Sequence, residues 1–191
     1  MKVLLKEARA ILKIKRSKFI ANLKRVDSID EAKKFISEMS KNFKDATHNC
    51  WAYRVLELGK LVEHYSDAGE PPGSAGLPIL NALRRFDLVN VAVVVTRYFG
   101  GVKLGIKGLR SAYHDVVLKA LQDAEISEAK VLKIYKNLVG YPKLGSFLSG
   151  IERSNGKILK MNHLPEGVEI VYAIEREGDG EFIGEGIFEA E

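Results

Sequence analysis

The sequence contains a single cysteine, Cys50, in 191 residues, which excludes an internal disulfide framework. It has no run of about 20 apolar residues of the kind that crosses a membrane. Charged residues interrupt the apolar N-terminus too soon for a secretory signal. We therefore expect a cytoplasmic protein without a membrane partner. There is no repeat or low-complexity segment, and 46% hydrophobic with 29% charged residues is typical of a folded globular chain.

Several chemical signatures are also missing. No G-x-x-x-x-G-K-[ST] motif occurs, and the spacing of Gly101, Gly105 and Gly108 does not fit G-x-G-x-x-G, so neither a P-loop nor a dinucleotide fold is indicated. Residues 73–76, with the sequence GSAG, do not form the G-x-S-x-G elbow of a hydrolase, so Ser74 is not predicted to be a nucleophile.

Metal binding has weak support. His48 and Cys50 lie on one side of an H-x-C segment, and His64 follows, but no second C-x-x-C or H-x-x-H pair completes a zinc site. Cys50 is more often a core residue in such a place. We predict neither a metal nor a cofactor.

Charge divides the chain unequally. Residues 1–130 contain 23 Lys and Arg against 15 Asp and Glu, a net charge of +8, whereas residues 131–191 contain 7 against 10, a net charge of −3. The hydrophobic pattern also restarts near Ser127. We therefore predict two domains, 1–128 and 129–191, of which the first meets a polyanion and the second supports, orients or regulates it. The alternative is that the excess of positive charge comes from solvated surface lysines, which would give the same net charges.

Hydrophobic periodicity predicts the elements of the first domain. Ser28 and Glu31 form a capping box at the start of one helix, and Ser74 is the expected cap of another. A turn at Gly59 and Lys60 joins two strands. Residues 10–26 are expected to form a pair of strands with a basic connection at 15–18. Further strands are expected over 50–58, 61–65 and 90–96, and helices over 29–43, 74–86 and 107–124.

The second domain has the pattern of a small two-layer α+β domain of ferredoxin-like type. A strand over 131–139, a helix over 141–153 and strands over 157–162 and 168–174 are followed by an acidic tail with spaced glycines. From this tail we expect the domain to be curtailed at its C-terminus.

Residues 97–108 stand between a buried strand and a helix and contain four glycines. Glycine allows a sharp turn and close approach of a ligand, and a helix N-terminus presents unpaired N–H groups and partial positive charge. With four cations nearby, this junction is predicted to hold an anion, most simply phosphate. A packing role for the glycines is the alternative. The predicted anion-binding residues are Arg97, Tyr98, Gly100, Gly101, Lys103, Gly105, Lys107, Gly108 and Arg110.

The loop over 66–76 is expected to shape the same site. Asp67 and Glu70 have two interpretations: they act as acid and base or hold a metal, or they cap a helix and pair with Arg97. We expect Asp67, Glu70, Arg97 and Lys103 to surround one cleft. Aromatic residues nearby are either core residues or a surface on which bases stack; these are Trp51, Tyr53, Tyr98 and Phe99. The predicted site-shaping residues are His48, Trp51, Tyr53, Asp67, Gly69, Glu70, Gly73, Ser74 and Gly76.

Several of these segments together resemble the IMPACT/YigZ family over nearly the whole chain. The resemblance rests on two long motifs and three shorter ones, with Asn49 and Pro72 as small departures. The long motifs are 67–78 (DAGEPPGSAGLP) and 97–105 (RYFGGVKLG), and the shorter ones are 17–20 (SKFI), 48–53 (HNCWAY) and 108–113 (GLRSAY).

The resemblance implies an α+β protein of two domains. The first would be shaped like the second domain of a small-subunit ribosomal protein, as also found in elongation factor G, and the second would be ferredoxin-like. Eukaryotic relatives restrain a kinase of the starvation response through an extra N-terminal domain. The short segment before Ser17 leaves no room for that domain, so we expect a member of the short type.

Two functions follow from these observations. The leading hypothesis is a translation-associated regulator that binds RNA or the ribosome through the basic, glycine-rich junction, without being an enzyme. The alternative is an enzyme acting on a phosphorylated small molecule or nucleotide, with Asp67 or Glu70 as acid, base or metal ligand. A phosphate-containing ligand would suit both.

Overall fold

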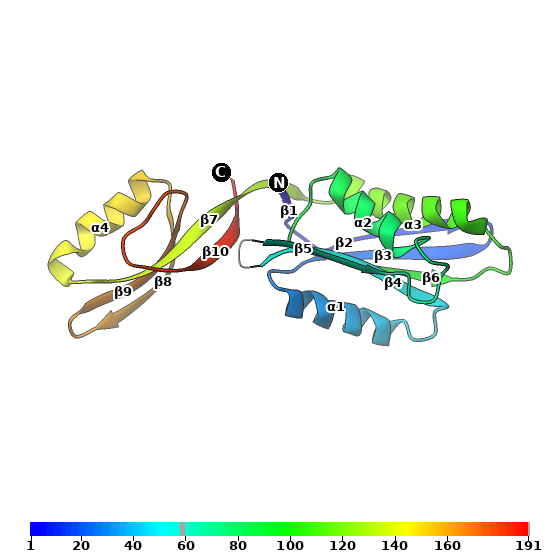
Figure 1. Cartoon of the computed structure of the whole chain (residues 1–191), viewed down its shortest axis with the longest axis horizontal. Coiled ribbons are helices and arrows are strands. Elements are labelled where there is room, and N and C mark those ends of the chain that lie inside the picture. The colour runs from blue at the N-terminus through cyan, green and yellow to red at the C-terminus, as the bar shows by residue number, and fades with distance from the viewer. Residues whose placement is uncertain (58–59, 191) are drawn as a thin grey trace. The chain divides into compact units, whose positions relative to one another are not determined.

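The computed structural model describes residues 1–57 and 60–190. This part of the chain contains four helices and ten strands, and the strands form two sheets. The protein therefore has a mixed α+β fold (Figure 1). The chain folds as two compact units, Met1–Glu128 and Ala129–Glu191.

The first unit is built on one antiparallel sheet between two helical layers (Figure 1). Two helices, α2 (Gly76–Arg85) and α3 (Gly105–Gln122), cover one face, and α1 (Ile29–Asn42) covers the other. The central strand is buried on both sides, as its apolar sequence VAVVV predicts. In spatial order the strands are β2 (Ala8–Ile14), β3 (Ser17–Arg25), β6 (Val91–Tyr98), β4 (His48–Glu57) and β5 (Lys60–Ser66).

The first helix begins where the capping box predicts. The Ser28 hydroxyl accepts a hydrogen bond from the Glu31 N–H at 3.1 Å. The Glu31 carboxylate accepts from the Asp27 N–H at 2.9 Å, one residue before the usual partner in this motif. The helix ends within one residue of the predicted boundary, and its Ala32 and Phe35 are buried against the sheet.

The start of α2 differs from the prediction. The helix begins at Gly76 rather than Ser74, its cap residue is Ala75, and no side chain of a neighbouring residue caps it. The Ser74 hydroxyl instead donates to the Pro71 carbonyl at 2.6 Å. A carboxylate from earlier in the loop, that of Asp67, accepts from the N–H groups at the helix start, and it replaces the predicted cap.

Other boundaries shift by a few residues. The helix predicted over 107–124 begins at Gly105 as α3, two residues early. A strand that the sequence analysis omits, β1 (Lys2–Leu4), pairs with the first three residues of β7 (Ile126–Val139); three residues are too few to show a period. The predicted turn at Gly59, and the end of the strand predicted over 50–58, lie outside the described residues.

The second unit has a last strand, contrary to the expectation that its C-terminal tail ends without one. The acidic tail forms a full strand that pairs antiparallel with β7. Glycines and a register shift between Phe182 and Gly184 interrupt the alternation that would reveal it. The remaining elements are α4 (Tyr141–Arg153), β8 (Lys157–Leu164), β9 (Gly167–Ile174) and β10 (Glu181–Glu189). The strand order is β10-β7-β9-β8, and α4 packs on one face around Tyr135 and Tyr172.

Candidate functional site

The glycine turn between β6 and α3 packs directly on the turn between β2 and β3. A Cβ atom at Gly100 would lie 2.1 Å from the carbonyl carbon of Arg16, so glycine is required there. The Gly100 N–H donates to the Ser17 hydroxyl at 3.2 Å. Two basic segments far apart in sequence, 15–18 and 97–107, therefore meet at one end of the sheet, as Figure 1 shows.

No side chain caps the N-terminus of α3. Its cap residue is Leu104, and its first turn contains no acidic residue. The first N–H groups of the helix therefore lack partners within the helix, and the positive end of its dipole is uncompensated. Lys103 and Lys107 stand on either side of this end, both exposed. Neither makes an ion pair within the residues that the structure describes.

A buried charge pair lies beside this helix end. Arg97 is 5% exposed and Glu70 is 8% exposed, and Arg97 Nη1 donates to Glu70 Oε1 at 2.6 Å. The Tyr113 hydroxyl donates to the same oxygen at 2.7 Å. Strand register fixes the arginine, because β6 pairs it with Phe19 on one side and His48 on the other. This predicted pairing of Glu70 with Arg97 is thus observed.

One polar atom of that pair has no partner. Arg97 Nε is fully buried and makes no hydrogen bond within the described residues, while Nη2 has only the Ser17 hydroxyl at 3.5 Å. The guanidinium carbon lies 5.4 Å from the ring centroids of both Phe19 and Phe99. The arginine is held by aromatic faces as much as by hydrogen bonds.

Asp67 has a different task from Glu70. Its carboxylate accepts from three backbone N–H groups, those of Gly73 at 2.8 Å and of Ala75 and Gly76 at 2.9 Å each. These bonds close the loop on itself and satisfy the start of α2. The acid–base hypothesis is therefore less favoured for Asp67 than the capping hypothesis, since both oxygens are occupied by backbone donors.

His48 and Cys50 are also engaged, and they do not converge with His64. His48 Nδ1 donates to the Ala68 carbonyl at 2.9 Å, which leaves Nε2 3.9 Å from Glu70 Oε2. Cys50 Sγ lies 2.9 Å from the carbonyl oxygen of Asp67. Burial raises the pKa of Cys50 to about 12, so the thiol stays protonated at neutral pH, a form that neither binds zinc nor attacks a substrate. No group of three metal-binding side chains occurs in the described ranges.

An open cavity of about 430 Å³ lies beside the buried charge pair. Its polar lining comes from the charge pair and its neighbours, and its apolar lining comes from the loop, the glycine turn and α3. The polar residues are Thr47, His48, Glu70, Arg97 and Lys103. The others are Pro71, Phe99, Leu104, Gly105, Ile106 and Leu109.

The structure brings together only some of the predicted site residues. Of the four expected around one cleft, Glu70, Arg97 and Lys103 line the cavity and Asp67 does not. The Tyr98 hydroxyl donates to Asp45 at 3.1 Å. Arg110 Nε donates to the Gly73 carbonyl at 3.0 Å, which ties α3 to the loop. Gly69 and Gly73 lie in the loop, and Gly76 begins α2. Gly100 and Gly101 lie in the glycine turn, and Lys107 and Gly108 lie in the first turn of α3.

Trp51 and Tyr53 do not line this cavity, so their prediction as site-shaping residues is wrong, and the core alternative is the one observed. Successive residues of a strand point to opposite faces, so β4 presents Cys50 towards α2 and α3 and presents Trp51 and Tyr53 towards α1. The two rings stack on each other at 5.9 Å between centroids, and the His64 ring lies 5.6 Å from that of Tyr53. They are core aromatics of the opposite layer.

Three polar partners in this region are not among the predicted site residues: Ser17, Thr47 and Tyr113. The Thr47 hydroxyl accepts from the Phe99 N–H at 2.9 Å and so fixes the start of the glycine turn. Tyr113 offered a usable indication: it stands in the apolar stripe of a helix, and a buried tyrosine hydroxyl needs a hydrogen-bond partner.

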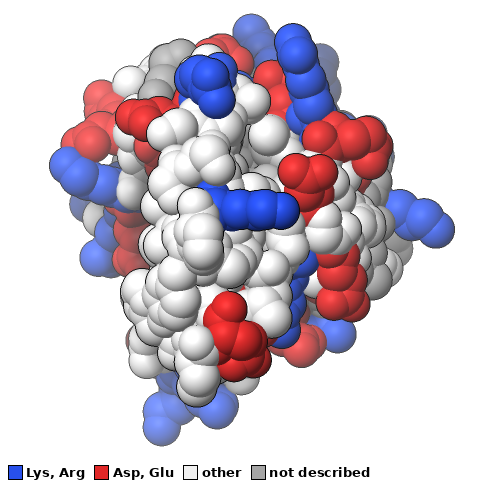
Figure 2. Space-filling model, turned by 90° about the vertical axis from the view of Figure 1, so that its left-hand side faces the viewer, with Lys and Arg blue, Asp and Glu red and all other residues white. Residues whose placement is uncertain are grey.

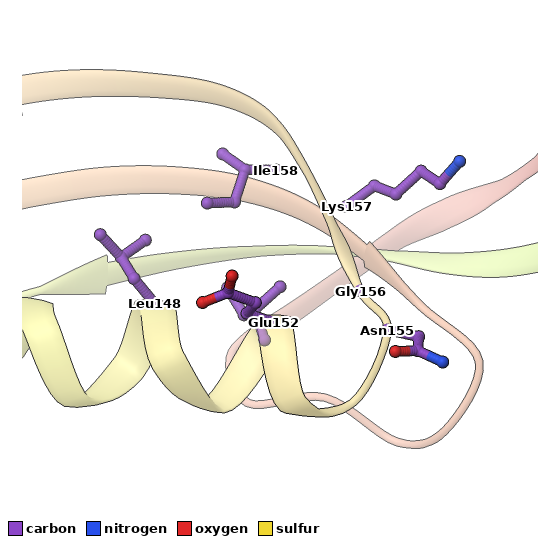
Figure 3. Close-up of a pocket in the computed structure, with 7 residues that line it drawn as sticks. Leu148, Glu152, Asn155, Gly156, Lys157 and Ile158 are labelled. Atoms are coloured by element: carbon purple, nitrogen blue, oxygen red, sulfur yellow. The ribbon is translucent and has the colours of Figure 1, made fainter. Parts of the chain in front are cut away.

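The second unit contains a hollow of its own, of about 520 Å³, between α4 and the edge strand β8. In Figure 3, Leu148 and Ile158 point into this space and Lys157 points away from it. Figure 2 shows the left-hand end of Figure 1, where a broad uncharged area is crossed by a few charged side chains. The exposed large apolar residues of the second unit are Leu138, Tyr141, Ile158, Leu159, Met161, Phe182 and Ile183.

Fold and site together define a class: an α+β protein of two units, whose first unit holds a buried Arg97–Glu70 pair beneath an open cavity. Residues 15–121 match the Impact N-terminal domain. The chain therefore belongs to the IMPACT family, and the resemblance found in the sequence is confirmed.

Individual relatives extend the likeness beyond that domain. The chain is 39% identical to IMPACT family member YvyE of Bacillus subtilis, covering 86% of this chain and 75% of that protein. It is 32% identical to IMPACT family member YigZ of Escherichia coli, covering 78% and 74%. A crystal structure of a hypothetical protein has a TM-score of 0.68 at 28% identity and covers 91% of this chain and 84% of its own.

Within residues 1–57 and 60–190, none of the helices has the length and hydrophobicity that a membrane crossing requires.

Proposed function

We propose that this protein is a cytoplasmic, translation-associated regulator that binds RNA or the ribosome through the basic end of its first unit. One observation carries the proposal: the uncapped N-terminus of α3 lies between Lys103 and Lys107. The turn that contains Lys15 and Arg16 packs against the same glycine turn. We call this set, Lys15, Arg16, Lys103, Lys107 and the start of α3, the basic end.

The chemistry of the basic end suits phosphate. Unpaired helix N–H groups and a positive dipole end bind phosphate groups directly, and phosphate contacts account for most of the affinity of proteins that bind nucleic acid without reading sequence. The uneven charge of the chain, +8 over residues 1–130 and −3 over residues 131–191, supports a polyanion as partner of the first unit.

Family membership supports the link to translation, because the family resemblance implies a pairing of ribosome-related and ferredoxin-like domains. We propose that the two units are these domains, with boundaries at 1–128 and 129–191. The strand order β10-β7-β9-β8 supports the ferredoxin-like assignment. Residues 175–180 would then replace the second helix of a β-α-β-β-α-β unit.

The contacts of the two loop carboxylates favour binding over catalysis. Asp67 accepts three backbone hydrogen bonds, and Glu70 is buried against Arg97 and Tyr113. Neither carboxylate has the free, solvent-facing geometry of a general acid or base at the entrance of the cavity. These contacts support a binding role for the two carboxylates.

The test is the salt dependence of binding to single-stranded RNA and to purified ribosomes. Each phosphate contact contributes about 0.7 to 0.9 to the slope of log K against log salt. We expect Lys103→Ala and Lys107→Ala each to lower the slope by about that amount, with little dependence on RNA sequence.

Lys33→Ala is the matched control, because Lys33 is exposed on α1, on the opposite side of the same sheet. It should leave the slope unchanged. Absence of binding by the wild-type chain to either partner at about 50 mM salt, where phosphate contacts are strong, would refute the proposal. Equal effects of all three substitutions would refute the basic end as the site.

A further inference from the structure

The cavity beside the basic end is more than a phosphate needs. Phosphate requires donors within hydrogen-bond distance, which the start of α3 and Lys103 supply at the rim. A hollow of about 430 Å³ falls instead in the range of about 300–1,000 Å³ that is typical of pockets for small organic molecules. Its walls include Phe99, Leu104 and Ile106, so the group that enters it is largely apolar.

One wall offers a face for stacking. The Phe99 side chain is 45% exposed although it follows a buried strand, and its ring already lies against the guanidinium of Arg97 at 5.4 Å. An aromatic ring beside an arginine plane is the arrangement on which unpaired bases stack in proteins that bind single strands.

The floor of the cavity carries unused hydrogen-bonding capacity. Glu70 Oε1 accepts from Arg97 and Tyr113, whereas Oε2 has only His48 Nε2 at 3.9 Å within the described residues. Arg97 Nε has no partner at all there. The free oxygen of Glu70 is an acceptor beside the cavity, and it fits the amino group of a base.

We propose that this cavity receives one unstacked, amino-bearing base of an RNA strand while the adjoining phosphates lie on the start of α3 and Lys103. The inference rests on the proposed function and deepens it, because it assigns base contact to a site whose rim holds phosphate. Uracil presents a carbonyl oxygen where cytosine presents an amino group, so the carboxylate of Glu70 disfavours uracil.

The test compares three single strands of equal length, about eight units, which is within the span of a single-strand site. They are an all-cytidine RNA, an all-uridine RNA and an abasic ribose-phosphate strand of the same charge. Fluorescence anisotropy with the full chain should give tighter binding of the cytidine strand than of the abasic strand by about 5- to 100-fold. The affinity for the cytidine strand should exceed the affinity for the uridine strand roughly tenfold.

Phe99→Ala should remove most of the preference for the cytidine strand over the abasic strand and leave the salt slope unchanged, because no phosphate contact is lost. The matched control is Phe182→Ala, an exposed phenylalanine of the second unit, which should change neither quantity. Melting temperatures of both variants establish that they are folded.

Each outcome separates this inference from the proposed function. Equal binding of cytidine and abasic strands would overturn the base assignment while RNA binding stands, and would leave the cavity to another occupant such as an apolar side chain of a protein partner. Equal binding of cytidine and uridine strands would overturn the role of Glu70. Binding of none of the strands, nor of ribosomes, would overturn both proposals.

Discussion

The two units contain hollows of comparable size and different chemistry. The hollow of the second unit is the larger, about 520 Å³ against about 430 Å³, but its polar lining consists of surface side chains such as Glu152 and Asn155. The hollow of the first unit has a charge pair at its floor, with both members more than nine-tenths buried. Cavity volume alone therefore does not identify the candidate site. The buried charge pair of Arg97 and Glu70 distinguishes the hollow of the first unit.

Burial of this pair is difficult to attribute to stability. Desolvation of two charges often cancels their attraction, and apolar residues of equal volume frequently serve as well. Within the described residues, Nε of Arg97 has no hydrogen-bond partner, which adds to the unfavourable side. A structural pair would be expected to use all of its donors, so the incomplete satisfaction favours a role in holding a ligand.

The sharpest way to test this difference is to remove the arginine. Arg97→Leu leaves the Glu70 carboxylate buried without its counter-ion, and we expect the free energy of unfolding to fall by about 3–5 kcal/mol. Glu152→Ala, at the hollow of the second unit, should change it by no more than about 0.5 kcal/mol. Urea unfolding followed by circular dichroism measures both. A loss below about 1 kcal/mol for Arg97→Leu would mean that the pair is solvated in solution.

Sequence reasoning succeeded here where the determining contacts are local. The capping box at Ser28, the helix over 141–153 and the glycine junction each depend on residues a few positions apart. It failed where the partner is distant or the period is interrupted. Asp67 caps a helix eight to nine residues away, and the glycines of β10 conceal its alternation.

The candidate site shows the same division. Arg97, Glu70 and Lys103 were predicted together from their charge and their glycine-rich surroundings, and they line one cavity. Trp51 and His48 are separated by three positions of one strand, and an odd separation puts two residues on opposite faces, so Trp51 lies in the core on the side of α1. The hydroxyl of Tyr113 was overlooked because its helix stripe is otherwise apolar.

Loss of the Asp67 charge should lower the stability of the protein without changing its affinity for RNA. Asp67→Asn keeps the shape but replaces one acceptor oxygen by a donor, which faces backbone N–H groups at 2.8–2.9 Å. We expect the free energy of unfolding to fall by up to about 2 kcal/mol, the upper range for a helix cap. RNA affinity should be unchanged at temperatures where the variant is fully folded. Thermal unfolding and anisotropy check the two parts. Unchanged melting with abolished turnover of a phosphorylated substrate would restore the enzyme hypothesis.

Alkaline pH should destabilise the first unit through its lone thiol. Burial raises the pKa of Cys50 from 9.0 to about 12, so between these values the unfolded chain releases a proton that the folded chain retains. Stability is therefore present below pH 9 and is lost as pH rises towards 12. The loss at about pH 10 should be roughly 1.4 kcal/mol, one pKa unit of differential binding.

The readout is the difference in pH dependence between the wild type and Cys50→Ala, measured by urea unfolding with the single tryptophan, Trp51, as probe of the first unit. Subtraction of the variant removes the titration of the lysines and of the tyrosines other than Tyr113. The Tyr113 hydroxyl lies 3.3 Å from the thiol, and burial and the thiol both raise its pKa, so the difference reports the thiol together with its effect on Tyr113. Parallel pH profiles for the two proteins would show that the thiol is not buried.

The smallest expected effect on stability comes from a lysine near the start of one helix in each unit. Lys107 and Lys143 are each the third residue of a helix, α3 and α4, whose first turn lacks an acidic residue. A cation there opposes the helix dipole, so replacing either lysine by alanine should raise stability by about 0.3–1 kcal/mol. Only Lys107→Ala should also lower the salt slope of RNA binding, because only α3 begins at the basic end. If both substitutions raise stability and neither alters binding, the uncapped start of α3 is a tolerated imperfection of the helix, as in α4, and the phosphate contacts lie elsewhere on the first unit.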